Sequence, residues 1–362
     1  MTQSLVVGVD AGATSTRVSV HALDGSRVGY ARAGAGNPTA HGLDKAVAAI
    51  TDALGAALGP HDGGRVVASL AGVAGQVAEM VPALAKVWAD HGIAKGPRFM
   101  GDVPIAYAAG SAEPDGSLLL SGTGAVAARI KGYQLDVIAD GLGWLLGDAG
   151  SGFWIGRAAA KAVVDAFDRG LPVEAIDTAG TNAQAIDTAR TDVQAIDTAA
   201  TEVPYGPSDA ARAPGPVGGL LTALVARHFL GDERPATPRG VADRIVRLAQ
   251  ADHMRLAALS SLVNQAAAAG DPVALKITEE AAERLVATLR RVHVSGPVVL
   301  AGSVLTSEGP VRQAVTELLA GETVTTARDA AGAAAWLAAR ALLPEADAKA
   351  RHTAFTAPPV AA

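Results

Sequence analysis

The chain has 362 residues, of which 49% are hydrophobic and 18% are charged, and its formal net charge is −6. This length suggests two domains, and the composition is typical of a soluble globular protein. The charge balance gives no reason to expect binding to nucleic acid or a membrane surface. No apolar stretch reaches membrane-spanning length, so we expect a cytoplasmic protein. The absence of cysteine excludes disulfides, thiolate catalysis and iron–sulfur clusters.

The first predicted strand, residues 5–9, ends at Asp10 and leads into a turn rich in small and hydroxyl-bearing residues. Residues 17–21 then resume the alternation of a strand, which indicates a β-hairpin. Backbone N–H groups in such a turn can crowd onto an anion, and Asp10 beside them can hold a hydrated Mg²⁺. The candidate phosphate-binding residues are Gly12, Ala13, Thr14, Ser15 and Thr16. An ordinary hairpin turn is the alternative.

The pattern that follows the hairpin predicts a βββαβα unit. Its further elements are a strand at 27–32, a turn at 35–39, a helix at 43–58, a strand at 65–70, a helix at 77–91 and a strand at 97–101.

A second unit with the same pattern begins at residue 118. The turn Ser121-Gly122-Thr123-Gly124 occupies the place that the first turn has in the first unit, which strengthens the phosphate-binding interpretation of both. Its predicted elements are strands at 118–120, 125–130 and 134–139, a Gly-rich stretch at 140–152, a helix at 153–167, a strand at 298–300, a helix at 309–319 and a strand at 323–326.

Four further helices are predicted in the sequence between the two halves of the second unit, and a fifth is predicted after that unit. They are predicted at 218–229, 238–250, 256–269, 272–291 and 330–343. A strict ten-residue repeat of Ala-Ile-Asp-Thr-Ala starts at 175, 185 and 195, and a ten-residue period cannot keep one helix face buried. We expect a surface insertion at 173–203, made of short helical turns or a disordered loop, and a flexible tail at 347–362.

Phosphoryl transfer needs a phosphate cradle, Mg²⁺ and a carboxylate that takes the proton from the attacking hydroxyl. Asp102 is the candidate base, because it follows a predicted strand at the junction of the two units. The alternative is that Asp102 is the N-cap of a helix that starts at Pro104. No lysine that would reach the phosphates is evident, so backbone donors and the metal would carry the charge.

Three further polar positions lie in turns where they could contact a substrate. Asn37 and Asp148 could hydrogen-bond hydroxyls of a polar substrate, or could instead stabilise their own loops. Asp140 is a further candidate for ligand contact. Gly302-Ser303 ends a strand, where the backbone could approach a flat base or could simply connect strand to helix.

The ordered set of motifs resembles that of the sugar kinase, hsp70 and actin superfamily, and more narrowly the branch of N-acetylglucosamine kinases and BadF/BadG-type ATPases. The resemblance covers nearly the whole chain except the decapeptide insertion and the tail. It implies a two-domain actin-like ATPase fold of the ribonuclease H-like, α/β kind, with duplicated βββαβα units and a cleft between them. The motifs are Asp10 to Thr16, Asp102, Ser121 to Gly124, Gly147 to Gly152 and Leu300 to Ser303.

The resemblance also implies roles for these residues and a division into domains. Both turns would bind ATP phosphates, Asp10 would place Mg²⁺, Asp102 would be the base, and Gly302 with Ser303 would lie under adenine. The sugar would contact Asn37, Asp102, Asp140, Gly143 and Asp148. The smaller domain would comprise residues 1–113 and a terminal helix at about 330–346, and the larger domain residues 114–329.

The chain departs from the family pattern in the sugar loop, where Leu142 replaces a frequent tryptophan and Ala149 a glutamate. It looks most like glucosamine kinases of actinobacterial type. We therefore expect phosphorylation of the 6-hydroxyl of glucosamine, with N-acetylglucosamine as the alternative acceptor. An ammonium group would favour nearby carboxylates and an acetyl group an apolar pocket, and Asp140 with Asp148 favour the ammonium.

Two other functional classes are alternatives to a kinase. An activating ATPase of a radical dehydratase would need cysteines for a bridging iron–sulfur cluster, and the chain has none. A non-catalytic ATP- and sugar-binding regulator is the remaining alternative, although related repressors carry an added DNA-binding domain and this chain starts at its first strand. A homodimer is compatible with the sequence.

Overall fold

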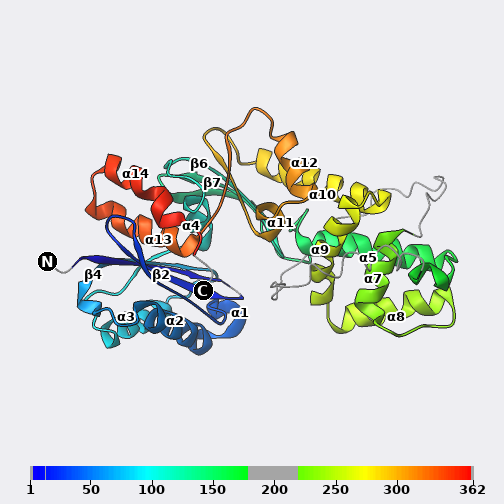
Figure 1. Cartoon of the computed structure of the whole chain (residues 1–362), viewed down its shortest axis with the longest axis horizontal. Coiled ribbons are helices and arrows are strands. Elements are labelled where there is room, and N and C mark those ends of the chain that lie inside the picture. Colours follow the sequence, from blue (N-terminus) through cyan, green and yellow to red (C-terminus); the bar gives the residue numbers. More distant parts are fainter. Residues whose placement is uncertain (1–2, 13, 178–218, 360–362) are drawn as a thin grey trace.

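The computed structural model describes residues 3–12, 14–177 and 219–359. Ala13 of the first turn and most of the predicted decapeptide insertion lie outside these ranges. The described residues form two five-stranded mixed sheets with helices packed against them (Figure 1).

The first sheet has the strand order β3-β2-β1-β4-β5. The hairpin β1–β2 and the pair β2–β3 are antiparallel, whereas β4 and β5 join in parallel. The strands are β1 (Leu5–Ala11), β2 (Thr16–Ala22), β3 (Arg27–Ala33), β4 (Val66–Val73) and β5 (Arg98–Met100).

The second sheet repeats this topology with the order β8-β7-β6-β9-β10, and β6 and β9 take the central places that β1 and β4 have in the first. This repetition confirms the predicted duplication of a βββαβα unit. The strands are β6 (Gly116–Ser121), β7 (Ala125–Lys131), β8 (Gln134–Asp140), β9 (Val298–Ala301) and β10 (Val324–Thr326).

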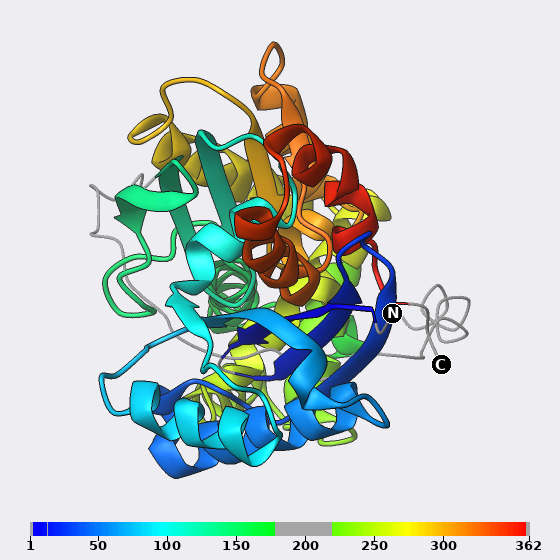
Figure 2. The same cartoon turned by 90° about the vertical axis from the view of Figure 1, so that its left-hand side faces the viewer.

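Helices cover both faces of the first sheet (Figure 2). On one face lie α2 (Leu43–Leu58), predicted at the same bounds from its apolar spacing, and α3 (Met80–Asp90), predicted at 77–91. On the other face α13 (Ala330–Ala339) approaches β1 so closely that a Cβ on Gly8 would overlap the backbone of Ala331 and Ala335. Alanines at the α13 positions nearest Gly8 have little side-chain bulk, which permits this close packing.

Helix α4 (Asp102–Ala108) lies between the two sheets. Ile105 and Ala108 pack with Val6 and Leu70 of the first sheet. Tyr107, which is fully buried, packs with Leu118, Ala128 and Val299 of the second sheet, and its hydroxyl donates to the Asp115 carbonyl at 2.9 Å. Helix α4 is therefore fixed by contacts with both halves of the molecule.

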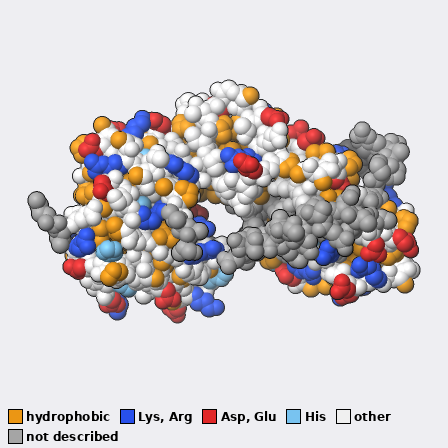
Figure 3. Space-filling view, viewed as in Figure 1, with side chains coloured by type: hydrophobic (Ala, Val, Ile, Leu, Met, Phe, Trp, Pro, Cys, Tyr) orange, Lys and Arg blue, Asp and Glu red, His pale blue; other side chains and the backbone are white. Residues whose placement is uncertain are grey.

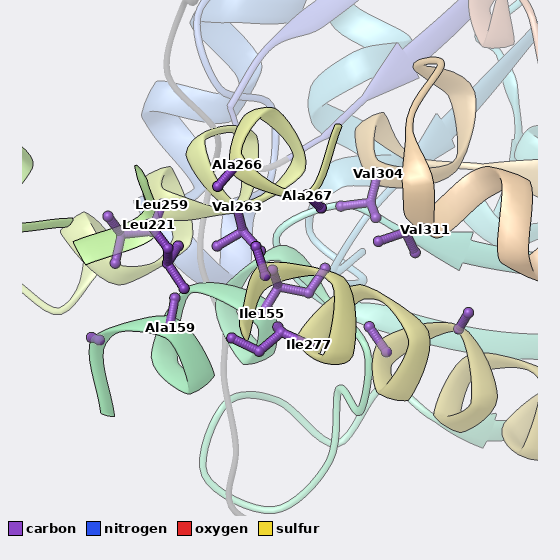
Figure 4. Close-up of a cluster of buried hydrophobic side chains, with 14 of the residues drawn as sticks. Ile155, Ala159, Leu221, Leu259, Val263, Ala266, Ala267, Ile277, Val304 and Val311 are labelled. Atoms are coloured by element: carbon purple, nitrogen blue, oxygen red, sulfur yellow. The ribbon is translucent and has the colours of Figure 1, made fainter. Parts of the chain in front are cut away.

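Five helices form a helical layer that contains the largest buried apolar cluster (Figure 4), and α10 (Pro272–Arg290) joins this layer to the second sheet. Ile155 and Ala159 meet Leu259, Val263 and Ile277 there. The helices are α5 (Gly152–Asp168), α7 (Leu220–Leu230), α8 (Pro238–Ala251), α9 (Met254–Ala268) and α10. All five were predicted within two or three residues of these bounds.

The predicted flexible tail at 347–362 is wrong for most of its length, because residues Glu345–Thr356 form helix α14. Phe355 of α14 is fully buried and stacks on His21 with ring centroids 4.8 Å apart, and Ala348 accepts a hydrogen bond of 2.7 Å from the Trp336 indole. The two prolines at 358–359 only mark the end of this helix. A tail rich in alanine can thus be ordered by packing alone.

The remaining elements are short, except for α12. They are α1 (Pro38–His41), η1 (Gly63–Arg65), η2 (Val173–Ile176), α11 (Ser303–Thr306), α12 (Pro310–Leu318) and η4 (Arg340–Leu342). Within the described ranges, no helix has the length and apolar character needed to cross a membrane.

Candidate active site

The first predicted phosphate turn connects β1 to β2 and is closed by backbone hydrogen bonds. The Gly12 N–H donates to Ser15 O at 3.0 Å, and the Gly36 N–H donates to Gly12 O at 2.8 Å. The Thr16 hydroxyl is buried and has no hydrogen-bond partner among the described residues. A buried hydroxyl without a partner is unusual in a folded protein.

Asp10, the predicted metal-placing residue, forms an ion pair with Arg17, whose Nη1 lies 3.0 Å from the carboxylate. The two residues face each other across the hairpin. Burial raises the pKa of Asp10, Arg17 acts in the opposite direction, and the Asp102 charge raises it further. Arg17 was missed in the sequence, although direct pairing of 10 with 17 follows from a symmetrical hairpin.

Asp10 and its turn fit a hydrated magnesium ion. Mg²⁺ keeps several waters and is commonly bound through one or two carboxylates plus substrate phosphates. Among the residues that the structure describes, no group of three or more His, Asp or Glu side chains could hold a metal ion by itself. A single carboxylate beside a predicted phosphate-binding turn matches that mode of binding, with Arg17 as the partner that the ion would displace.

The second predicted phosphate turn, between β6 and β7, is tied to the start of α5. The Gly122 N–H donates to Gly124 O at 2.9 Å, and the Gly152 N–H donates to Gly122 O at 2.7 Å. The Ser121 hydroxyl donates to the Gly150 carbonyl at 3.0 Å. As in the first turn, one hydroxyl, that of Thr123, is buried without a partner among the described residues.

Gly302, expected to lie under adenine, packs against this second turn. Its φ of +80° lies in the left-handed region, and an added Cβ would come within 2.7 Å of the Gly122 nitrogen and overlap Ser121. Only glycine satisfies both conditions. Ser303, the second predicted residue, begins α11. The structure therefore brings Gly302 and Ser303 to the Ser121–Gly124 turn, whereas their contact with a base stays a prediction.

Asp102 is the first residue of α4, and the N-cap is Gly101, with no capping bond from a side chain. The alternative that Asp102 caps a helix starting at Pro104 is therefore wrong. Solvent reaches Asp102, yet the surrounding protein raises its pKa through desolvation. A carboxylate at a helix N-terminus, accessible and with a raised pKa, is suited to accept a proton.

The two aspartates of the loop between β8 and α5, Asp140 and Asp148, have different surroundings. Asp140 accepts backbone hydrogen bonds from Asp148 at 2.5 Å and from Ala149 at 3.0 Å, so it stabilises its own loop. Asp148 is only 4% exposed and has a positive φ of 54°. Burial, assisted by the Asp140 charge, raises the pKa of Asp148 to about 7. A Cβ on Gly124 would lie 2.9 Å from the Asp148 carboxylate, which places Asp148 against the second turn.

The other two predicted sugar contacts lie in turns that they help to form. The Asn37 side chain accepts from the backbone of Thr39 at 2.9 Å and Ala40 at 3.0 Å and so caps α1. The Gly143 carbonyl accepts from Leu146 at 3.2 Å and Gly147 at 3.1 Å. For Asn37, stabilisation of its own loop is the alternative that the sequence offers to sugar binding. Contact of Asn37 or Gly143 with a sugar stays a prediction.

The site residues thus form two groups, one around the β1–β2 turn and one around the β6–β7 turn. The first contains Asp10, Arg17 and Asn37, and the second contains Asp148 and Gly302. Asp102 starts the helix that is packed between the two sheets. Figure 3 shows the outline notched between the body that contains the first sheet and the body that contains the helical layer.

Two such hairpin turns, one in each of the duplicated units, are typical of an ATPase with the actin-like, two-domain fold. The chain belongs to the BadF/BadG/BcrA/BcrD ATPase family, whose model matches residues 7–339.

Solved structures with the same fold include two proteins described as candidate N-acetylglucosamine kinases. The one from Chromobacterium violaceum has 20% sequence identity and a TM-score of 0.57, and the match covers 92% of this chain and 99% of that chain. The one from Porphyromonas gingivalis has 15% identity and a TM-score of 0.57, covering 97% and 98%. A search of curated proteins finds no match.

Proposed function

We propose that this protein is an ATP-dependent sugar kinase that phosphorylates the 6-hydroxyl of a hexosamine. The observation that carries the proposal is the position of Asp102 at the start of α4, a helix packed on both sheets, in a molecule whose two sheets each present a phosphate-type turn. Kinases of N-acetylglucosamine are named among the proteins that share the fold, which supports a sugar as acceptor.

Residues around both the β1–β2 turn and the β6–β7 turn would act on ATP and the sugar. The backbone N–H groups of the two turns would receive the phosphates. Asp102 would accept the proton of the sugar 6-hydroxyl while the hydroxyl oxygen bonds to the γ-phosphorus of ATP. The bond between the γ-phosphorus and the oxygen that bridges it to the β-phosphorus breaks, which gives ADP and the sugar 6-phosphate. Mg²⁺, held through Asp10, would neutralise charge on the phosphates.

The choice between glucosamine and N-acetylglucosamine is part of this proposal. Glucosamine was favoured because Asp140 and Asp148 could hold its ammonium group. However, Asp140 already accepts two backbone hydrogen bonds, and the pKa of Asp148 is raised to about 7, so part of its population is uncharged at neutral pH. Both features support N-acetylglucosamine as the first candidate, with glucosamine second.

A coupled assay of ADP release across N-acetylglucosamine, glucosamine, glucose and mannose tests the proposal. We expect release that depends on the sugar and on Mg²⁺, with N-acetylglucosamine giving the highest kcat/KM. Mass spectrometry of the product and digestion by a phosphatase would identify the 6-phosphate. Release that is independent of every sugar would favour the non-catalytic or simple ATPase alternatives and would overturn the kinase proposal.

A further inference from the structure

The loop between β8 and α5 exposes four large apolar side chains within five consecutive residues. Their exposed fractions are 70% for Leu142, 40% for Trp144, 54% for Leu145 and 74% for Leu146. Single exposed apolar residues are common, whereas a contiguous set marks a surface that something else covers. We call these four residues the apolar shelf.

Trp144 is held in one orientation although it is exposed. Its ring stacks on His253 with centroids 4.8 Å apart and an interplanar angle of 16°, and it lies tilted against Phe153 at 5.8 Å. The loop itself is closed by the hydrogen bonds to Asp140 and to the Gly143 carbonyl. An aromatic ring that is already fixed loses little conformational entropy when a ligand binds.

The apolar shelf adjoins the candidate site. Phe153, which contacts Trp144, donates its backbone N–H to Thr123 O of the second turn at 3.3 Å. Asp148 follows Leu146 by two residues and lies against Gly124 of the same turn. Trp144 and the leucines of the shelf therefore belong to the loop predicted to hold the sugar, and this loop is tied to the second turn.

We propose that Trp144 binds the N-acyl group of the acceptor, and that the leucines of the apolar shelf let the enzyme accept 2-acylamino sugars whose acyl chain is longer than acetyl. This inference rests on the proposed kinase function. The planar amide and its alkyl group suit the face of an indole ring, and the two carboxyls of the loop are poorly placed to hold an ammonium group instead. Each methylene that covers apolar surface improves binding by up to about fourfold.

Kinetics with a series of acceptors tests this. For the wild type, we expect kcat/KM to rise about two- to fourfold per methylene from N-acetyl- to N-propanoyl- to N-butanoylglucosamine. Trp144→Ala should lower kcat/KM for the N-acyl sugars at least about tenfold, change that for glucose less than about twofold and abolish the rise with chain length. Trp144→Phe should restore part of the loss. Val294→Ser, at another exposed apolar residue, is the matched control and should change none of these.

Intrinsic fluorescence provides a readout that needs no turnover. Trp88 and Trp336 are fully buried, and Trp154 is half-buried against Arg284, so Trp144 is the most exposed tryptophan of the four. Titration with N-acetyl- and N-butanoylglucosamine should change the emission of the wild type and of Trp154→Phe. The same titration should leave Trp144→Phe unchanged.

Three outcomes would overturn the inference. An equal loss for glucose and for the N-acyl sugars in Trp144→Ala would mean that the ring contacts the pyranose rather than the acyl group. A fall in kcat/KM with chain length would mean that the shelf is closed to longer chains. Unchanged kinetics with an altered mass in light scattering would mean that a second copy of the chain covers it. If the wild type phosphorylates no sugar, the proposed kinase function fails, and the fluorescence titrations alone decide the role of Trp144.

Discussion

Asp102 and Asp148 are two carboxyls with raised pKa values, but different surroundings suit them to different roles. Asp102 begins a helix and is open to solvent, so a substrate hydroxyl can reach it. Asp148 is buried against the second turn. Of the two carboxyls, only Asp102 is therefore open to a substrate hydroxyl.

The substitution Asp102→Asn keeps the size of the side chain and removes its ability to accept a proton. We expect kcat to fall about 10²- to 10⁴-fold, while the dissociation constant for ATP changes little, because the phosphate turns remain intact. Steady-state assays and calorimetric titration with a non-hydrolysable ATP analogue measure the two quantities. Asp90→Asn, at an exposed residue paired with Lys86, is the control and should retain wild-type rates. Retention of activity by Asp102→Asn would show that another group is the base.

The raised pKa of Asp148 predicts how stability depends on pH. Its pKa is about 7 in the folded protein and near 3.8 in the unfolded chain, so the unfolded chain loses its proton first. The stabilisation is complete below about pH 4 and is lost as the pH rises toward 7, by up to about 1.4 kcal/mol per pH unit. Asp148→Asn should remove this slope. Urea unfolding of both proteins at several pH values between 4 and 7 measures it, and identical slopes would contradict the assignment.

At the scale of elements, the contact of α13 with β1 depends on the absence of a side chain at Gly8. A Cβ there would overlap the α13 backbone, which cannot move aside as a flexible side chain could. We expect Gly8→Ala to lower the free energy of unfolding by about 2–3 kcal/mol. Chemical denaturation measures the loss. Gly34→Ala, where an added Cβ would meet nothing within 4 Å, is the matched control, and equal effects of the two changes would rule out this explanation.

At the scale of the whole molecule, α14 joins parts of the chain that are far apart in sequence. His352 pairs with the Ala108 carbonyl of α4 at 2.7 Å, Phe355 stacks on His21 of β2, and Arg27 of β3 pairs with Asp329 and with the Ala357 carbonyl. These contacts hold the terminal helices on the first sheet and support the helix that carries Asp102. The terminal helices therefore pack with the first sheet and with α4.

The substitution Phe355→Ala tests this role. Phe355 is fully buried, so its removal should destabilise the protein by about 3–5 kcal/mol. Because α14 contacts α4, we also expect hydrogen exchange in α4 to accelerate more than in the distant helix α8. Exchange measured by mass spectrometry checks this order. Phe355→Leu should lose less stability, and a loss confined to α14 itself would contradict a supporting role.

The sequence by itself determined the duplicated units, the helices of the helical layer and the two turns, since these depend on local periodicity and on glycine and hydroxyl residues close together in the chain. It also singled out Asp102, because a carboxylate after a strand at the junction of two repeats is visible in the order of residues. Tertiary structure alone decided what depends on packing between distant segments. Residues 347–356 fold because Phe355 finds a buried partner in His21, Asp140 is occupied by its own loop, and Arg17 takes the carboxylate of Asp10. The exposed and rigid ring of Trp144 likewise depends on His253, more than a hundred residues away along the chain.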